Sequence, residues 1–428
     1  MAKASRQAFY GWRVVAAAFV VAVFGWGIGF YGPPVFLGVV RATRGWSIAL
    51  VSAAVTAHFL IGAGVGAIVP QLYRRFGAAR VTMAGSLCMA AGVAGWAAAA
   101  APWQLFIATI LTGLGWGTMS AAAINALVSP WFVRGRPAAL GMAYNGGSIG
   151  GAIFSPLWVA AIGTLGFEGA TEAIGIAMVL IVWTLASLYF LRTPQQMGLV
   201  PDGGQSTSGS KRAPRPEPVL PGPLLLRDRK FLTLAAGMAL GLFAQIGLVA
   251  HLYTLMSPVI GAQPAGLAMG LATALAIIGR IAMGWLVPVD ADRRLIACAG
   301  YALQCAGSLS FALSGGSATL LLLGIMLFGC GFGNATSLPP LIAQTEFADE
   351  DTSRAVSLIV AISQATYAFA PATFGLIRDH VAVAGNAALG VFILAATLQA
   401  LAIATFYAGR RERPIERAYR VGTGFSPR

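Results

Sequence analysis

Long apolar stretches alternate with short polar segments along most of this 428-residue chain. Each stretch runs for about 20 residues, which is the length that an α-helix needs to cross the hydrocarbon core of a bilayer. The pattern therefore predicts an all-α integral membrane protein. We place twelve transmembrane helices at residues 12–36, 47–70, 81–100, 104–128, 138–162, 172–191, 231–257, 265–288, 295–314, 318–343, 355–377 and 387–408.

One polar segment is much longer than the others. Residues 192–230 are rich in Pro, Gly and Ser, a composition that predicts a flexible, solvated linker. The division that follows is an N-terminal six-helix bundle (1–191), the linker (192–230), a C-terminal six-helix bundle (231–408) and a tail (409–428).

A repeated turn indicates that the two bundles are pseudo-symmetric. Gly66-Ala-Ile-Val-Pro70 precedes Arg74 and Arg75 in the first half, and Gly284-Trp-Leu-Val-Pro288 precedes Arg293 and Arg294 in the second. Related halves with a binding site at their interface are a common plan among secondary transporters.

Composition agrees with membrane insertion. Hydrophobic residues make up 57% of the chain and charged residues 10%, and mean hydropathy is +0.77. A soluble protein carries about 25% charged residues, so this chain has too little polar surface to cover a soluble core. The four cysteines lack metal-ligand spacing, and we expect no disulfide, metal or cofactor.

The net charge of +14 reflects topology rather than a nucleic-acid partner. Nearly all of the 28 Lys and Arg residues fall in the tails, the linker and the loops on the same side, whereas Arg41, Arg44 and Arg378 fall on the other. Positive charge marks the cytoplasmic side. The pattern predicts a multi-pass protein with both termini in the cytoplasm.

A single charged residue lies well inside a predicted span. It is Arg280, and none of the 14 Asp and Glu residues lies in the middle of a span. An intramembrane charge is costly and usually functional, and a guanidinium matches a carboxylate through two parallel hydrogen bonds. The sequence thus predicts that Arg280 binds an organic anion. The alternative is that Arg280 reaches the cytoplasmic face or hydrogen-bonds carbonyls of a broken helix.

Other polar residues within the spans are weaker candidates. His58 and His251 titrate near neutral pH and could carry a coupling proton, or could join helices as neutral rings. Uncharged side chains could complete a binding cavity or hold helices together. These are Tyr31, Asn125, Asn145, Gln245, Asn334, Gln364 and Tyr367. Tyr31 follows a Gly-rich stretch and precedes Pro33-Pro34, which should bend the first helix.

Glycine repeats occur in two predicted spans. Gly113-Leu-Gly115-Trp-Gly117 and Gly329-Cys-Gly331-Phe-Gly333 lie within apolar sequence, where small residues allow close helix packing. We interpret them as packing sites rather than phosphate loops.

The layout and three stretches resemble a known family. Tyr10-Gly-Trp-Arg-Val-Val15, Arg75-Phe-Gly-Ala-Ala-Arg80 and Trp131-Phe-Val-Arg134-Gly-Arg136, with Gly141, Gly146 and Gly150 following, look like the bacterial monocarboxylate and oxalate/formate branch of the major facilitator superfamily. The turns after the second and eighth helices keep the family's glycine and basic residues. They lack its acid, which Pro70 or Arg74 and Pro288 replace, with Asp290 and Asp292 close by.

The resemblance implies the major facilitator fold and a place in the bacterial inner membrane. It also implies that Arg280 corresponds to the carboxylate ligand in the eighth helix of monocarboxylate transporters. Proton-coupled members carry an Asp one turn earlier, where this chain has Ala276, so their carboxylate-based coupling is not inherited.

We therefore expect a monomeric secondary active transporter of a small organic anion, working by alternating access in the bilayer. An unpaired Arg280 favours exchange for a counter-anion, or symport with protons, over uniport. The alternatives are an exporter of bulky or hydrophobic compounds and a non-transporting receptor. Exporters usually carry a membrane-embedded acid, and a receptor would need a signalling domain. No enzyme motif appears in the sequence.

Overall fold

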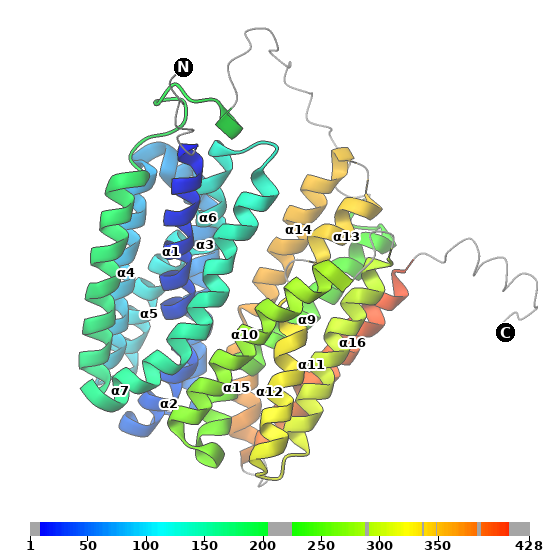
Figure 1. The fold of residues 1–428 in the computed structure, drawn as a ribbon. Helices are drawn as coiled ribbons and strands as arrows, with labels where there is room; N and C mark the ends of the chain where they lie inside the picture. Colours follow the sequence, from blue (N-terminus) through cyan, green and yellow to red (C-terminus); the bar gives the residue numbers. More distant parts are fainter. Residues whose placement is uncertain are drawn as a thin grey trace, which may run out of the picture.

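The structure is a computed structural model that describes residues 9–203, 225–286, 291–335, 338–347, 349–382 and 387–410. Most of the predicted linker and tail, together with Pro288 and Asp290, lie outside these ranges. The described residues are helical throughout their length apart from short connections, and they form two groups that face each other (Figure 1). This arrangement confirms the predicted fold of two six-helix bundles.

The first group contains the helices of the N-terminal half. Their bounds are α1 (Tyr10–Gly29), α2 (Gly32–Arg44), α3 (Ile48–Phe76), α4 (Ala78–Ala98), α5 (Pro102–Met119), α6 (Ala121–Val128) and α7 (Arg136–Tyr189). A straight helix as long as α7 would extend about 80 Å. Gly166 interrupts it with φ 73° and ψ 173°, a conformation that favours glycine, so α7 crosses the membrane twice.

The second group contains the C-terminal half. Its helices are α9 (Arg229–Ile260), α10 (Ala262–Leu286), α11 (Arg293–Ala312), α12 (Ala318–Phe332), α13 (Leu338–Glu346), α14 (Asp349–Tyr367), α15 (Ala370–Ala382) and α16 (Ala387–Ala408). Ten helical segments of the described chain are long and apolar enough to span a bilayer, and α12 is a shorter apolar helix.

Several predicted spans are broken in the middle. The predicted bend of the first span is confirmed, because α1 ends at Gly29 and α2 begins at Gly32. The same kind of break separates α12 from α13 and α14 from α15, where the hydropathy pattern predicts continuous helices. A helix break within a membrane span frees main-chain carbonyls from their helical partners, and such groups must be satisfied by other parts of the protein.

The two glycine repeats pack in the same way in both halves, as predicted. A side chain at Gly113 or Gly117 would collide with α3, and one at Gly115 would collide with α4. In the second half, Gly329 and Gly333 lie against Ala272 and Ala276 of α10, and Gly331 lies against Gly300 of α11. In each bundle, the glycine-repeat helix (α5 or α12) therefore uses alternate glycines to approach two neighbours.

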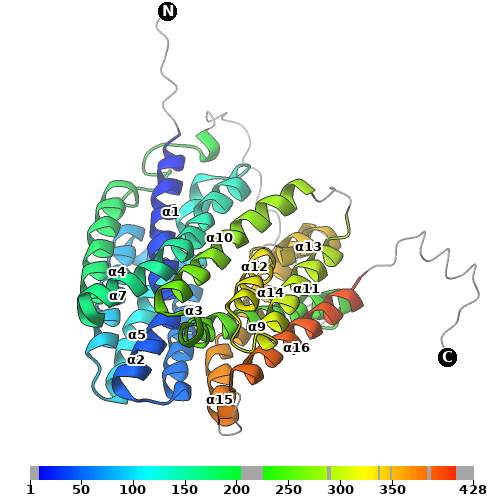
Figure 2. The ribbon, with the colours of Figure 1, turned by 60° about the horizontal axis from the view of Figure 1, so that its bottom comes forward.

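The two halves contact each other on one side of the molecule. We call the side that carries the start of α1 and the end of α16 the terminal side, and the opposite side the far side (Figure 1). The main connecting pairs are α2 with α9, α3 with α15, and α7 with α10, and α3 also touches α14. Figure 2 shows α2 and α15 at the far side, away from the ends of the chain.

Candidate functional site

Arg280 lies between the two halves. It is half-buried on α10, six residues before Leu286, or about 9 Å along the helix. Its Nε donates a hydrogen bond to Gly333 O at the α12–α13 break, at 3.0 Å. Its Nη1 donates to Asn145 Oδ1 of α7, at 3.3 Å. The first contact agrees with the alternative prediction, in which Arg280 hydrogen-bonds a carbonyl of a broken helix. The second contact links the two halves.

These two bonds leave part of the guanidinium available. An arginine offers five N–H donors, and the Nη2 group and the second N–H of Nη1 have no acceptor among the described residues. No described carboxylate pairs with Arg280, since the ion pairs found join Arg294 to Glu346 and Arg410 to Asp292. The outer edge of the fork could therefore accept a bidentate anion.

In the first half, the position that corresponds to Arg280 is packed against a neighbouring side chain and carries no polar group. The repeated turn relates Gly66 to Gly284 and hence Gly62 to Arg280. A side chain at Gly62 would collide with the indole of Trp116 on α5. The two halves are thus alike in packing but differ in chemistry, with a cationic group at this position in the C-terminal half only.

Both intramembrane histidines also bond to carbonyls at helix breaks. His58 Nε2 donates to Gly29 O at the end of α1, at 2.9 Å, and Nδ1 lies 3.0 Å from Thr112 Oγ1. His251 Nε2 donates to Pro371 O at the start of α15, at 3.0 Å. The Nδ1 atom of His251 is buried without a partner. Both nitrogens of His58 are therefore engaged, whereas His251 keeps one free lone pair.

Tyr31 and Tyr367 lie where the halves meet. Tyr31 is 4% exposed in the α1–α2 break, and a side chain at Gly151 of α7 would collide with its ring. Tyr367 ends α14, and its ring centroid is 6.3 Å from that of Phe59 on α3.

The other predicted residues are dispersed. Asn334 is buried beside Gly333 and lines a small cavity with Tyr301 and Gln304. Gln245 is buried on α9 with its Oε1 unpartnered. Gln364 is half-buried on α14, and Asn125 is exposed on α6, where it accepts from Ser129. Of the seven, Asn145 hydrogen-bonds to Arg280, and Tyr31 lies within electrostatic range of the guanidinium.

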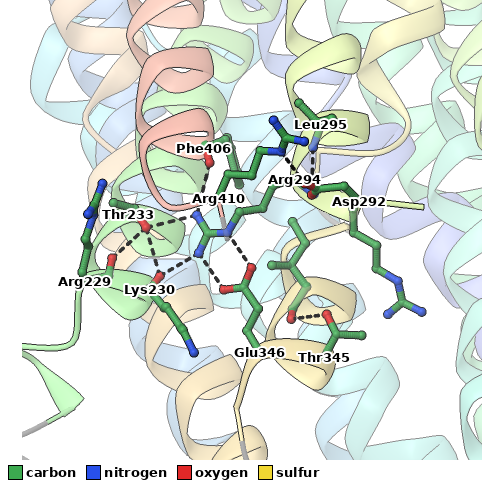
Figure 3. Close-up of polar contacts among 12 residues, drawn as sticks. Arg229, Lys230, Thr233, Asp292, Arg294, Leu295, Thr345, Glu346, Phe406 and Arg410 are labelled. Atoms are coloured by element: carbon green, nitrogen blue, oxygen red, sulfur yellow. Dashed lines mark hydrogen bonds and ion pairs between the residues drawn. The ribbon is translucent and has the colours of Figure 1, made fainter. Parts of the chain in front are cut away.

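A buried arginine joins four helices, although the hydropathy pattern predicts that this residue lies in a loop. Arg294 of α11 is 1% exposed and uses all five N–H groups (Figure 3). It forms two bonds with the Glu346 carboxylate, at 2.6 and 2.8 Å. It also donates to Thr233 Oγ1, Lys230 O and Phe406 O. The cluster joins α9, α11, α13 and α16 at the terminal side.

Charged residues also connect the halves at the far side. Asp379 Oδ2 of α15 accepts from Ala49 N in the first turn of α3, at 2.8 Å. About two turns further along, Ala372 N donates to Thr56 Oγ1, at 3.1 Å. Arg378, itself buried, donates to the hydroxyl and carbonyl oxygens of Thr254. These contacts hold α15 against α3 and α9.

The sequence carried no direct signal for these partners. Glu346 is 52 residues from Arg294, and Asp379 is 330 residues from Ala49. Both acids occur near predicted span ends, where a carboxylate is ordinarily solvated. Only the packing of the helices shows that they face a guanidinium and a helix N-terminus.

The sequence profile of the Major Facilitator Superfamily matches residues 14–371. No curated protein matches the chain. Three solved structures have a similar fold. A bacterial homologue of the human lysosomal transporter Spinster, inward-facing and unoccupied, has a TM-score of 0.70 at 14% identity and covers 95% of this chain and 99% of its own.

The other two carry different solutes. The nucleoside transporter NupG has a TM-score of 0.70 at 11% identity and covers 94% of this chain and 100% of its own. A D-xylose–proton symporter has a TM-score of 0.68 at 14% identity, with coverage of 93% and 97%. At these identities the likeness concerns the fold alone.

Proposed function

This chain belongs to the Major Facilitator Superfamily, and from that premise we propose that it is a secondary transporter of a small organic anion whose carboxylate binds Arg280. The observation that carries the proposal is the state of the guanidinium. It is half-buried between the halves, and among the described residues it has no carboxylate partner and its outer N–H groups have no acceptor.

The fixed contacts of Arg280 suit such a role. The Gly333 carbonyl and the Asn145 amide accept hydrogen bonds from Nε and Nη1 of the guanidinium, but as neutral groups they do not neutralise its charge. A carboxylate at the outer edge would supply the missing charge and two charge-assisted hydrogen bonds. An empty site that changes sides carries an unpaired cation, whereas a loaded site does not. This difference favours anion exchange, or symport with protons, over uniport.

The arrangement of the halves supports alternating access. Contacts between halves cluster at the far side, and Arg280 forms an inter-half contact deeper toward the terminal side. If the terminal side is cytoplasmic, as the distribution of positive charge predicts, the chain adopts an inward-facing state. One of the similar solved structures is likewise inward-facing and unoccupied. Far-side contacts would separate when the protein opens outward.

His251 is our candidate for a coupling proton. Its Nε2–H is held by Pro371 O, so a proton would bind at the unpartnered Nδ1. Within the described chain, Arg378 is the charged group in electrostatic reach of this ring, and Arg41 and Asp379 lie around Arg378. His251 is fully buried while the far side is closed, so a proton would reach Nδ1 after the halves separate there, which would link opening to protonation.

Transport in proteoliposomes tests the proposal. The purified protein should exchange radiolabelled short-chain carboxylates, and Arg280→Ala should reduce the rate at least tenfold while exposed Arg80→Ala keeps it. Arg280→Lys should remain impaired, because an ammonium lacks the planar fork. Xylose and a nucleoside serve as neutral controls. Wild-type carboxylate rates in Arg280→Ala, or transport of the neutral controls alone, would overturn the anion assignment.

The same liposomes test the coupling role. An imposed pH gradient should drive wild-type accumulation if His251 carries a proton. In His251→Gln, the gradient should lose its effect while counter-anion exchange continues. Unchanged gradient-driven uptake in this variant would remove His251 from the coupling.

A further inference from the structure

A small cavity lies inside the C-terminal half, at the break between α12 and α13. It is lined by residues of α11, of the break, of the start of α13 and of α16, and Tyr301, Gln304 and Asn334 are its polar members. The volume in which the centre of a water molecule fits is about 10 Å³. Such a space holds one water molecule and is too small for an organic ligand.

Two buried polar atoms at this cavity have no partner within the protein. The Tyr301 hydroxyl and the Gln304 Oε1 atom make no hydrogen bond in the described chain, although the two residues are only 2% and 1% exposed. They are three residues apart on α11 and therefore lie on the same face of the helix. Buried polar atoms without a partner are costly, and here both adjoin the same water-sized space.

Neighbouring groups prevent either side chain from turning away. The Tyr301 ring stacks on Phe406, with centroids 5.6 Å apart, and its hydroxyl occupies the space where a side chain at Gly241 would lie. Gln304 Nε2 donates to Gly331 O, at 3.1 Å. A reversed amide would place Oε1 against that carbonyl, so that two acceptors would face each other. Both orientations are therefore fixed by contacts other than the cavity.

We propose that this cavity is a built-in site for a single water molecule. The water accepts a hydrogen bond from the Tyr301 hydroxyl and donates one to Gln304 Oε1, because one of these groups can donate and the other can only accept. Its second hydrogen remains for a main-chain carbonyl, which matches the roughly three hydrogen bonds that buried waters make. The site thus ties α11 to the broken tenth span.

The same break carries the contact of Arg280. Gly331 O accepts from Gln304 of α11, and Gly333 O, two residues later, accepts from Arg280 of α10. A water that holds Gln304 in place stiffens the bend that sets the direction of the Gly333 carbonyl. The inference concerns the break itself, and it does not depend on which solute binds Arg280.

Charge favours water over a monovalent cation. No carboxylate is among the described residues that line the cavity. The charged side chain that bonds to this break is the guanidinium of Arg280, which would repel a second cation. A neutral ligand that both donates and accepts therefore fits the cavity.

Thermal unfolding of Tyr301→Phe tests the site by the sign of its effect. With water bound, loss of the hydroxyl removes one of its partners, and the melting temperature should fall by about 2–4 °C. Without water, the substitution would remove an unsatisfied buried hydroxyl and raise the melting temperature. Tyr407→Phe, exposed on α16, is the matched control and should unfold like wild type. An unchanged or raised melting temperature of Tyr301→Phe would overturn the proposal.

A double-variant cycle tests whether the two atoms share one ligand. In a Gln304→Met background, Tyr301→Phe should have less than half of its effect in wild type, because the water has already lost its acceptor. Fully additive effects would contradict a shared water. Replacing sodium chloride by choline chloride should leave the wild-type melting temperature unchanged, and stabilisation specific to sodium would assign the cavity to a cation instead.

A crystal structure of the wild-type protein that resolves ordered water gives a direct measurement without any variant. It should show one density peak within hydrogen-bond distance of both Tyr301 Oη and Gln304 Oε1. No density between these atoms would exclude the water site.

Discussion

At the scale of single residues, two arginines of this chain show how environment separates a structural from a binding role. Arg294 is almost fully buried, faces Glu346 and satisfies every donor within the protein. Arg280 is half-buried and bonds to two neutral oxygens, and its remaining N–H groups meet no acceptor in the part of the chain that the structure describes. Because a buried charge without compensation is costly, the incomplete partnership of Arg280 is the stronger sign of an external ligand.

Asp202 gives a prediction about pH at the same scale. Its carboxylate accepts hydrogen bonds from the main-chain N–H groups of Arg134, Val133 and Gly135, at 2.8, 3.0 and 3.1 Å. The bond from Arg134 contributes most to lowering the pKa of Asp202 below its ordinary value. The lowered pKa means that the carboxylate stabilises the fold above the unfolded pKa, and that this stabilisation is lost as pH falls through the folded pKa.

Asp202→Asn should therefore lower the melting temperature at pH 7 and pH 5. The difference from wild type should shrink below about pH 4, near the ordinary pKa of Asp, as the wild-type carboxyl becomes protonated. Thermal unfolding in detergent across this range measures both proteins, and half-buried Asp228, which caps α9, offers Asp228→Asn for comparison. A deficit for Asp202→Asn that grows with acidity would contradict the assigned sign.

At the scale of helices, the breaks inside the bundles organise the ionisable residues. Arg280, His58 and His251 each donate to a main-chain carbonyl at or next to a break, namely Gly333 O, Gly29 O and Pro371 O. A broken helix exposes carbonyls that lipid cannot satisfy, and a polar side chain in the same bundle needs an acceptor. The two requirements meet at the same places, which links each intramembrane polar group to a bend.

The Arg294 cluster predicts how the C-terminal bundle responds to loss of charge. Glu346→Gln removes one partner of a buried pair and leaves the guanidinium of Arg294 uncompensated (Figure 3). Breaking such a pair costs about 3–5 kcal/mol, so we expect a drop of several degrees in melting temperature.

Asp292→Asn is the matched control. The Asp292–Arg410 pair is more exposed, at 18% and 17% of the two side chains, and pairs near the surface contribute about 0–1 kcal/mol. Asn also retains the capping oxygen of α11. Equal losses in the two variants would mean that the cluster does not hold the four helices together.

At the scale of the whole molecule, the two halves pack in similar ways but contribute different residues to the proposed site. The glycine repeats and the repeated turns make the bundles alike. Arg280 belongs to the C-terminal half, and the N-terminal half supplies Asn145, which accepts a hydrogen bond from it. Movement between the halves would then assemble and open the site without rebuilding either bundle.

Cross-linking across the far side tests this movement. A Cβ atom at Gly38 of α2 would lie 3.0 Å from Thr254 Cγ2 of α9, close enough for a disulfide after a small adjustment. In a background without the native cysteines, Gly38→Cys with Thr254→Cys should cross-link on oxidation and lose at least nine-tenths of its transport. Dithiothreitol should restore the activity of the reduced double variant.

The single variants Gly38→Cys and Thr254→Cys control for the substitutions themselves. Neither should respond to oxidation. Full transport by the cross-linked protein would show that the far-side contact between α2 and α9 persists through the cycle, and would exclude the proposed separation of the halves there.

The sequence by itself determined membrane insertion, the two related halves, the bend near Tyr31 and the isolated position of Arg280. These follow from local properties, namely the length of apolar runs and the cost of a charge within them. Only the tertiary structure decided that Asn145 and Gly333 hold Arg280 and that Glu346 compensates Arg294. Those partners are separated along the chain, and they meet because close packing of helices sets which faces oppose each other.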